Sequence, residues 1–328
     1  MYSVSVYNTD LERQGIISGF ISLVWEEGYN TEGEFQLEVA LCDDYRELLQ
    51  LEWYCGLTGH DTLMIIKSVQ IEDDTIVANG YPATHIFEDR VSTTVVSDES
   101  AEAAMRSLVE EMEPYPCVEL GEEAGLDAVY EPETSDGTLL EYFEEIAQEC
   151  GIGFRLRHDK DNHKLLFEVY EGEENENAKF SSLYGNMGDI SYSLSTVDYK
   201  NVAVVAGQGE GDDRVTVYAG DTDAEGVDRR ELYVDARSEQ QEDDETDEEY
   251  EESLIATGEE KLAEQVKVES VEFTIADEEV GLGDTVYCYI PEIGINAKVQ
   301  VAAIEEVAQD NVVERTITLG DPIVLKRY

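Results

Sequence analysis

The hydrophobic pattern at the start of the chain is that of short β-strands. Residues 1–96 contain runs in which apolar and polar positions alternate, such as SVSVY (3–7), EFQLEVAL (34–41) and TLMIIKSVQI (62–71). Stretches rich in turn-forming residues separate these runs. Short strands at this spacing are typical of a small barrel or sandwich. We therefore predict a first β-barrel domain over residues 1–96.

After residue 96 the apolar positions follow a helical period. Residues 97–113 open with Ser97 and Asp98, whose side chains can cap a helix N-terminus. The apolar residues that would share one face of this helix are Ala101, Met105, Leu108 and Val109. The Pro-Tyr-Pro sequence at 114–116 should end the helix.

A second helix and a hairpin are expected next. Residues Thr138 to Cys150 place Leu139, Leu140, Phe143, Ile146 and Ala147 on one side, and the glycines of GIG (151–153) supply a helix stop. FRLRH (154–158) and KLLFEVY (164–170) then read as two strands joined by a DKDN turn. We predict that residues 97–197 form an α/β insertion.

From residue 198 the strand pattern returns, for example in NVAVVAG (201–207) and RVTVYAG (214–220). Residues 239–268 interrupt it with an acidic block, typical of a solvated segment, which runs into an amphipathic helix. The apolar positions of that helix are Leu254, Ile255, Leu262 and Val266. We predict a second β-barrel domain over residues 198–328. The expected fold is mainly β, with two small β-barrels and an α+β subdomain.

Charge narrows the classes of function. The 328 residues include 21 lysines and arginines against 77 aspartates and glutamates, a net charge of -56. Specific nucleic-acid binding is not expected, because phosphate contacts need lysines and arginines that displace counterions. The same argument excludes an anionic membrane surface. A high-salt habitat, cation binding, avoidance of DNA and other anions, and a merely acidic soluble protein all remain open.

The cysteines and the hydropathy indicate a soluble, cytoplasmically made chain. The five cysteines are odd in number and form no CxxC, so we expect small buried apolar residues rather than a disulfide framework or a zinc site. The N-terminus lacks the basic and apolar regions of a signal peptide. No run approaches the ~18 apolar residues of a membrane span.

Three glycines in AVVAGQGEGDDR are the first candidate for a binding site. Gly207, Gly209 and Gly211 follow an apolar strand, as in a dinucleotide-binding turn. That turn needs GxGxxG and a following helix, whereas here the third glycine comes one residue early and a strand pattern follows. The neighbouring carboxylates would repel phosphate. We predict a hairpin loop and no cofactor site.

Two further segments resemble metal sites weakly. HDKDNH (158–163) offers two histidines and two aspartates, but it falls where a turn is needed, so we favour a turn over metal binding. DTDAEGVD (221–228) has Gly226 at the sixth position of a calcium loop. Its twelfth position is Leu232, and strands flank it, so an EF-hand is disfavoured.

No motif for nucleophilic catalysis is present. None of the four histidines, His60, His85, His158 and His163, lies in a serine or cysteine hydrolase motif, and GxSxG does not occur. Carboxylates are so abundant that no acid/base pair stands out. We predict no catalytic, cofactor-binding or metal-binding residues, and no enzyme activity.

Four stretches in order resemble the phage tail hub family, the N-terminal module of siphophage tail-tip and tail-associated lysin proteins and their prophage relatives. They are GIISGFISLVWEEGYNTEGEFQLEVAL (15–41), TIVANGYPATHIFEDRV (75–91) with Arg90, FSSLYGNMGDISYSLSTVDYKNVAVVAGQGEGDDR (180–214) followed by RRELYVDAR (229–237), and GLGDTVYCYI (281–290). The third stretch, with Arg214 after the glycines, is the most specific. The resemblance covers nearly the whole chain.

The resemblance implies a baseplate-hub-like structural protein. Such a protein forms a homotrimer whose paired barrels make a ring on the distal tail protein or tail tube ring. The ring guides the tape measure protein and DNA, and tail fibre, receptor-binding or lysin proteins follow it. The expected location is the virion tail tip, after assembly in the host cytoplasm. The alternatives are a cell-wall hydrolase of the tail tip and a halophilic acidic ligand-binding protein. The chain ends at Tyr328, so the lytic domain of many relatives is expected to be missing.

Overall fold

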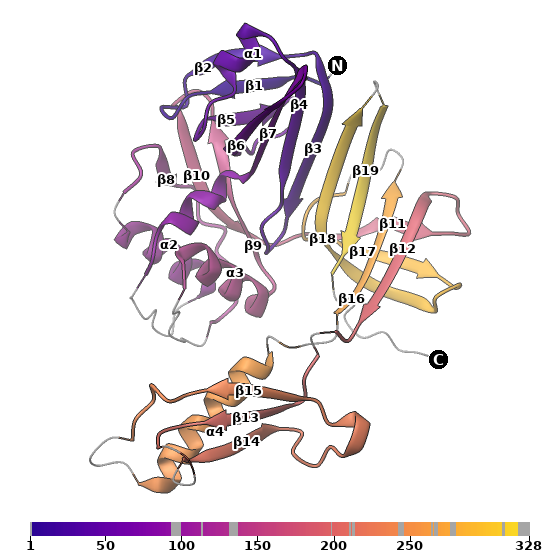
Figure 1. The fold of residues 1–328 in the computed structure, drawn as a ribbon. Coiled ribbons are helices and arrows are strands. Elements are labelled where there is room, and N and C mark those ends of the chain that lie inside the picture. The colour runs from indigo at the N-terminus through magenta and orange to yellow at the C-terminus, as the bar shows by residue number, and fades with distance from the viewer. Residues whose placement is uncertain are drawn as a thin grey trace. The chain divides into compact units, whose positions relative to one another are not determined.

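The computed structural model of the chain divides into two compact units (Figure 1). Unit 1 comprises Met1–Ser191 and Val271–Tyr328, and unit 2 comprises Tyr192–Ser270. The structure describes residues 2–92, 100–112, 114–130, 137–197, 199–209, 211, 214–241, 246–263, 265, 268–275, 280–309 and 312–320. The domain boundaries 1–96, 97–197 and 198–328 remain a prediction.

The N-terminal part of unit 1 is an antiparallel sheet. Its elements are β1 (Val4–Tyr7), β2 (Arg13–Ile17), β3 (Phe20–Gly28), β4 (Phe35–Ala40), α1 (Asp43–Leu48), β5 (Tyr54–Leu57), β6 (Met64–Glu72) and β7 (Thr75–Pro82). The alternation seen in the sequence determines which side is buried. In β4, for example, Phe35, Leu37 and Val39 point into the core while the residues between them are more exposed.

Two helices cover a small mixed sheet in the middle of unit 1. The elements are the 3₁₀ helix η1 (Ala83–Asp89), α2 (Ala101–Glu111), β8 (Val118–Leu120), α3 (Leu139–Cys150), β9 (Gly153–Asp159) and β10 (Lys164–Tyr170). The strand order is β8-β10-β9, with β9 and β10 antiparallel, as the predicted hairpin requires. The predicted helical faces are confirmed as buried and form one core with the sheet.

The helix caps follow local chemistry. Ser97 and Asp98 lie outside the described residues, and the N-cap of α2 is Ser100, whose side chain accepts a hydrogen bond from the Ala103 amide. Thr138 and Glu141 form a capping box at α3, and Gly151 ends that helix in the left-handed conformation with φ 65°. The predicted start and stop of the second helix are therefore confirmed.

Further strands continue the first sheet, and all of them lie within unit 1 except for the ends of two, which extend past its bounds at Ser191 and Val271. They are β11 (Glu174–Ser181), β12 (Met187–Ser195), β16 (Val268–Ile275), β17 (Thr285–Ile290), β18 (Ile295–Gln309) and β19 (Val312–Leu319). β18 pairs antiparallel with β3 in a register that places Val307 opposite Val24. One sheet thus runs in the order β12-β16-β19-β18-β3-β4-β7-β6-β5-β1-β2, and β17 pairs with both β18 and β11.

The mainly β fold is confirmed, but the prediction of two β-barrels is wrong, because the sheets are not closed. In the described part of the chain, β2 and β12 are the two ends of the strand order, and no strand joins them. The physical reason is that β3, which pairs with β4 on one edge, pairs with β18 on the other, so neither edge of β3 is left to close the first sheet on itself. Local alternation in the sequence predicts strands but not this long-range partner.

Unit 2 is a three-stranded sheet packed against one helix. β13 (Val202–Ala206) lies between β14 (Thr216–Gly220) and β15 (Glu231–Asp235), with η3 (Gly226–Asp228) before β15. Helix α4 (Asp247–Ala263) covers one face through Leu254 and Tyr250. These strands were expected in the same barrel as the strands after residue 268, but they form a sheet of their own.

The acidic block serves as the start of α4. Thr246 and Glu249 exchange hydrogen bonds, with the Thr246 amide donating to Glu249 Oε2 at 2.8 Å and the Glu249 amide donating to Thr246 Oγ1 at 3.3 Å. Carboxylates in the first turn also suit the helix dipole. Of the predicted apolar positions, Leu254 is buried, and Ile255 and Leu262 pack partly against the core. Val266 lies outside the described residues.

The cysteines and helices bear on two sequence expectations. All five cysteines are free, and Cys55 and Cys288 are buried as predicted, whereas Cys42 is exposed, at the N-cap of α1. The helices bear on the second expectation, that no segment spans a membrane. Among the helices in the described ranges, none has the length and apolar character that a membrane crossing needs.

Candidate functional site

The glycines at 207, 209 and 211 connect two antiparallel strands, as predicted. β13 and β14 pair from Val202 opposite Gly220 to Ala206 opposite Thr216, and the Gly207 amide donates to the Val215 carbonyl at 2.9 Å. Gly209 has φ 99° and Gly211 φ 61°, conformations that favour glycine. Their role in the structure is to turn the chain.

Gly207 serves a second purpose, which is close packing on α4. A Cβ at this position would lie 2.6 Å from the Tyr250 hydroxyl and 2.7 Å from Leu254 Cδ1. The same hydroxyl accepts a hydrogen bond from the Gln208 amide at 2.9 Å and donates to the Glu239 carbonyl at 2.8 Å. The loop is thereby fixed to the helix of unit 2.

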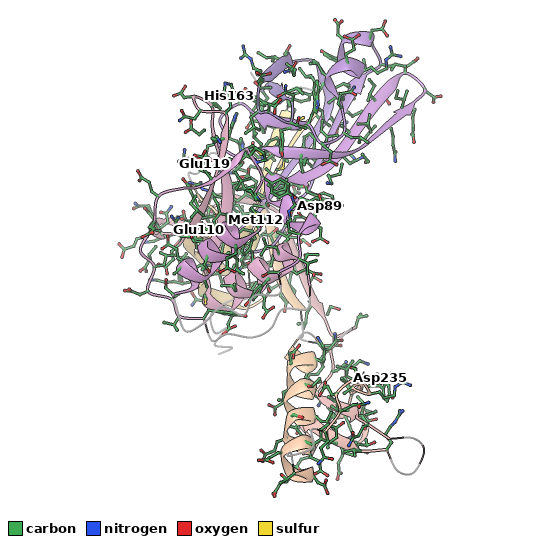
Figure 2. All side chains as sticks on the ribbon, turned by 90° about the vertical axis from the view of Figure 1, so that its left-hand side faces the viewer. Asp89, Glu110, Met112, Glu119, His163 and Asp235 are labelled. Atoms are coloured by element: carbon green, nitrogen blue, oxygen red, sulfur yellow. The ribbon has the colours of Figure 1, made fainter. Side chains whose placement is uncertain are left out.

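The segment 158–163 is a turn, as predicted. Asp159 accepts hydrogen bonds from the Asp161 and Asn162 amides at 3.1 and 3.2 Å. His158 points into the core against Tyr7, with ring centroids 4.7 Å apart, and burial lowers its pKa to about 4. His163 lies at the tip of the hairpin (Figure 2), and its Nδ1 is 2.9 Å from the Leu11 carbonyl oxygen. The two histidines therefore face different surroundings.

An arginine occupies the loop at 221–228. Arg229 Nη1 donates to the carbonyls of Thr222 at 3.0 Å and Ala224 at 3.4 Å. Its Nε also pairs with Glu231 at 2.7 Å. The guanidinium of Arg229 therefore binds two backbone carbonyls of this loop. Across the described ranges of the chain, no group of three His, Cys, Asp or Glu side chains is arranged to hold a metal ion.

The most unusual arrangement of charges in unit 1 is centred on His60, between β5 and β6. Its Nδ1 lies 3.7 Å from Glu27 Oε1 on β3, and its Nε2 lies 3.4 Å from Glu306 Oε2 on β18. The imidazole ring also lies 5.4 Å from the Trp25 ring. We call Glu27, His60 and Glu306 the ion triad. It lies where β3 pairs with β18, with Glu27 opposite Ile304 and Glu306 opposite Trp25.

Neighbouring donors complete the hydrogen bonding of both carboxylates. Glu27 accepts from Trp25 Nε1 at 3.1 Å and from the Thr62 hydroxyl. Glu306 accepts from the Tyr2 hydroxyl at 2.9 Å, and Arg315 Nε lies 3.8 Å from its other oxygen. Because these side chains are mostly withdrawn from water, such partners offset the cost of desolvating the charges.

The triad is charged at neutral pH. Burial alone would lower the pKa of His60, but the hydrogen bonds and charges of Glu27 and Glu306 outweigh it and raise the pKa to about 9. The hydrogen bond from His60 lowers the pKa of Glu306 despite burial. Burial opposes ionisation of Glu27 most strongly, yet His60, Thr62 and Trp25 together lower its pKa.

A cavity of about 460 Å³ adjoins the triad inside unit 1. It is lined from the first strands by Glu27 and His60, from the middle by Arg155 and Tyr170, and from the last strands by Glu306. Arg155 is itself held by Glu168 through Nη2 at 2.9 Å. The charged groups that reach the cavity are therefore largely paired with one another.

The geometry suits a clamp better than an acid/base pair. A general acid or base works best when its pKa lies near the working pH, whereas His60 stays protonated and both carboxylates stay ionised at neutrality. One cation between two anions, each on a different strand, holds the β3–β18 junction together. The sequence gives no local signal for this cluster, because His60 and Glu306 are 246 positions apart.

The sequence was compared with models of known protein families and with curated proteins. The model of the siphovirus ReqiPepy6 Gp37-like protein family matches residues 3–321. No curated protein matches the sequence.

Three solved structures with a similar fold are described as tail proteins. The tail protein from Neisseria meningitidis MC58 has a TM-score of 0.59 at 14% identity, over 98% of this chain and 96% of that chain. The 43 kDa tail protein of prophage MuSo2 from Shewanella oneidensis has a TM-score of 0.57 at 11% identity, over 98% of each chain. The prophage tail protein gp18 from Listeria monocytogenes EGD-e has a TM-score of 0.50 at 13% identity, over 98% of this chain and 96% of that chain. At these identities the likeness shows a shared fold.

Proposed function

Since the chain belongs to the siphovirus ReqiPepy6 Gp37-like family, we propose that it is a structural protein of a phage tail tip. The observation that carries this proposal is the fold, which nearly the whole chain shares with the Neisseria and Shewanella tail proteins. The expected resemblance to a tail family is thus confirmed, and the role in a tail follows from it.

In this proposal, three copies form a ring that caps the tail tube and guides the tape measure protein and DNA. The distal tail protein or the last tube ring lies on one side, and fibre, receptor-binding or lysin proteins lie on the other. The net charge of -56 supports a conduit role, because like charge on the wall disfavours adhesion of DNA. Screening limits this effect to wall charges within about 8 Å of the DNA at physiological salt.

The ion triad fits a mechanical role. In unit 1 the first and last strands form one sheet, and the triad ties them through side chains in addition to the backbone ladder. The chemistry at the junction is thus used to fix strands, and we assign the chain no enzymatic step.

Electron microscopy of the phage that encodes the chain tests the proposal. Gold-labelled antibodies against the chain should mark one end of the tail, and a phage lacking the gene should form no complete tails. Label on the capsid, or its absence from virions, would overturn the assignment. A gel containing peptidoglycan tests the rival cell-wall hydrolase, because clearing by the purified chain would show an activity that we do not expect.

A further inference from the structure

One face of the three-stranded sheet in unit 2 is open to solvent. Helix α4 packs against the other face, where Ala203 and Val217 are buried (Figure 1). Because strand residues alternate between the two faces, Val204, Tyr218 and Tyr233 lie on the side away from the helix.

These three residues form a row across the open face. Val204 lies opposite Tyr218 on β14 and opposite Tyr233 on β15. The two tyrosines are 51% and 62% exposed. Tyrosine offers a large ring at a low cost in side-chain entropy, and it often anchors protein interfaces. The row is therefore suited to contact with another chain.

Arginines lie beside both tyrosines. The guanidinium of Arg229 lies 5.7 Å from the centre of the Tyr218 ring, and Nη1 of Arg214 lies 3.5 Å from the Tyr233 hydroxyl. Arginine is the second residue type, after the aromatic ones, that is enriched at protein interfaces. We call Val204, Tyr218 and Tyr233, together with Arg214 and Arg229, the tyrosine face.

The carboxylates on this side of the sheet are paired with arginines. Glu231 binds Arg229 Nε at 2.7 Å, and Asp235, which Figure 2 shows on the side away from α4, binds Arg237. Arg214 Nε donates instead to a backbone carbonyl at 3.3 Å, and among the described residues no carboxylate forms an ion pair with it. A cation thus remains on this face for a partner.

The opposite side of the same unit is acidic. In α4, Tyr250 and Leu254 pack on the sheet, so residues half a turn away from them point outward. Those residues include Glu248, Glu252 and Glu259, all of which are exposed. We call these three glutamates the acidic stripe.

The tyrosine face and the acidic stripe match in length. Arg214 precedes β14, and Arg229 lies near the other end of that strand, where β15 begins. The five residues of β14 span about 14 Å. Along the helix axis, Glu248 and Glu259 are about 16 Å apart. A helix laid along the strands could therefore place a glutamate near each arginine.

We propose that the tyrosine face of one copy of this chain binds the acidic stripe of a second copy. The proposal rests on the proposed ring of copies and names one of its contacts. Two chains that each carry a net charge of -56 repel one another, so copies meet closely where cations face carboxylates. The two surfaces are different and lie on opposite sides of one unit, so the contact is head-to-tail and can repeat around a closed ring.

Sedimentation of the purified full chain over a wide concentration range tests the contact. Wild type should self-associate. Arg214→Glu and Glu252→Lys should each weaken association by about tenfold or more, because like charges would then meet. Glu110→Lys on α2 in unit 1 is the matched control, since Glu110 is also an exposed helical glutamate. It should associate like wild type, and circular dichroism should show all variants folded.

Mixing the two variants separates this contact from other causes of weak association. The Arg214→Glu copy keeps an intact acidic stripe, and the Glu252→Lys copy keeps an intact tyrosine face. A mixture should therefore form mixed dimers with the affinity of wild type, although neither variant associates well alone. A mixture that stays monomeric, wild type that stays monomeric, or unchanged association of either folded variant would overturn the inference.

A photo-crosslinking residue at position 233 identifies the occupant. The expected adduct has the mass of two copies, linked to residues 247–263 of the second. An adduct with another protein, or a link elsewhere in the chain, would also overturn the inference. If labelled virions still carry the chain at the tail end, the proposed function stands and only this contact is wrong. If the chain is absent from virions, the proposed function itself fails.

Discussion

His60 Nε2 lies 3.4 Å from Glu306 Oε2, although 246 positions separate the two residues. This contact and the one to Glu27 raise the pKa of His60 to about 9. The contact between His60 and Glu306 connects the loop between β5 and β6 with strand β18. Its loss should therefore destabilise the whole of unit 1.

Removing one carboxylate of the triad should destabilise the protein and change the titration of His60. Glu306→Gln should lower the free energy of unfolding by about 3 kcal/mol, because a mostly buried pair is broken. The pKa of His60 should fall below its value of about 9 in the wild type. Denaturant unfolding and histidine NMR measure the two effects. Glu305→Gln, the next residue on β18, is the control and should leave the titration of His60 unchanged.

The triad should also set a pH window for stability. The raised pKa of His60 contributes stability that is complete below about 6.5 and is lost as the pH rises through about 9. The lowered pKa values of Glu27 and Glu306 contribute stability above about 4.5 that is lost as the pH falls. The difference in Tm between wild type and His60→Gln should therefore be largest between these limits. A difference that grows above pH 9 would contradict this account.

Glu144 on α3 should lower the stability of the protein at high pH, whereas Glu27 and Glu306 raise it. Burial, together with the charges of Glu32, Glu141 and Glu88, raises its pKa to about 7. A carboxyl whose pKa is raised by folding lowers stability as the pH rises above its ordinary value of about 4.5, and the cost is complete above about 7. Glu144→Gln should therefore raise Tm at pH 8, and the gain should vanish near pH 4, where both side chains are neutral. Thermal scans at the two pH values measure this, and an equal gain at both would show that charge is not the cause.

Glu102 is a buried acceptor on which a loop depends. Its carboxylate accepts hydrogen bonds from the amides of Ala124 and Gly125, both at 2.7 Å, and Leu126 at 3.0 Å. Glu102→Ala should cost about 2 to 3 kcal/mol, because buried amides lose their partner. Amide exchange at residues 124–126 should accelerate in this variant. The exposed neighbour on the same helix, Glu110, gives the control Glu110→Ala, which should change neither quantity.

Gly80 should not tolerate any side chain. A Cβ at this position on β7 would overlap the carbonyl oxygen of Ile65 on β6, which is backbone and cannot swing away. Gly80→Ala should lower stability by about 3 kcal/mol or more, as strand pairing is forced apart. Gly281→Ala is the matched control, because its nearest neighbour is the Asp284 carboxylate at 3.4 Å. Unfolding curves of the two variants should differ clearly.

Features of the fold that depend on residues close together in the chain could be predicted from the sequence. The capping box of Thr138 and Glu141, the stop at Gly151 and the hairpin at 159–162 depend on residues within a few positions, and the structure has all three. The glycines between β13 and β14 likewise depend on the strand that follows them. Local hydrogen bonds and steric limits suffice for these features.

Features that depend on contacts between residues far apart in the chain could not be predicted from the sequence. The pairing of β3 with β18 turns two expected barrels into one open sheet, and nothing near residues 20–28 specifies residues 295–309. The ion triad has the same origin, since its members meet only after that pairing forms. Among so many carboxylates, Glu27 and Glu306 differ from the others by position and not by type.

The pairing of β3 with β18 has a consequence for how the protein is made. β3 leaves the ribosome early, but its partner strand is translated only near the end of the chain. Since translation adds about 5–20 residues per second, one edge of β3 stays unpaired for tens of seconds. During synthesis, Phe20–Gly28 is therefore a nascent edge that can misassemble with other chains. Production of this protein should depend on chaperones that shield that edge until translation is complete.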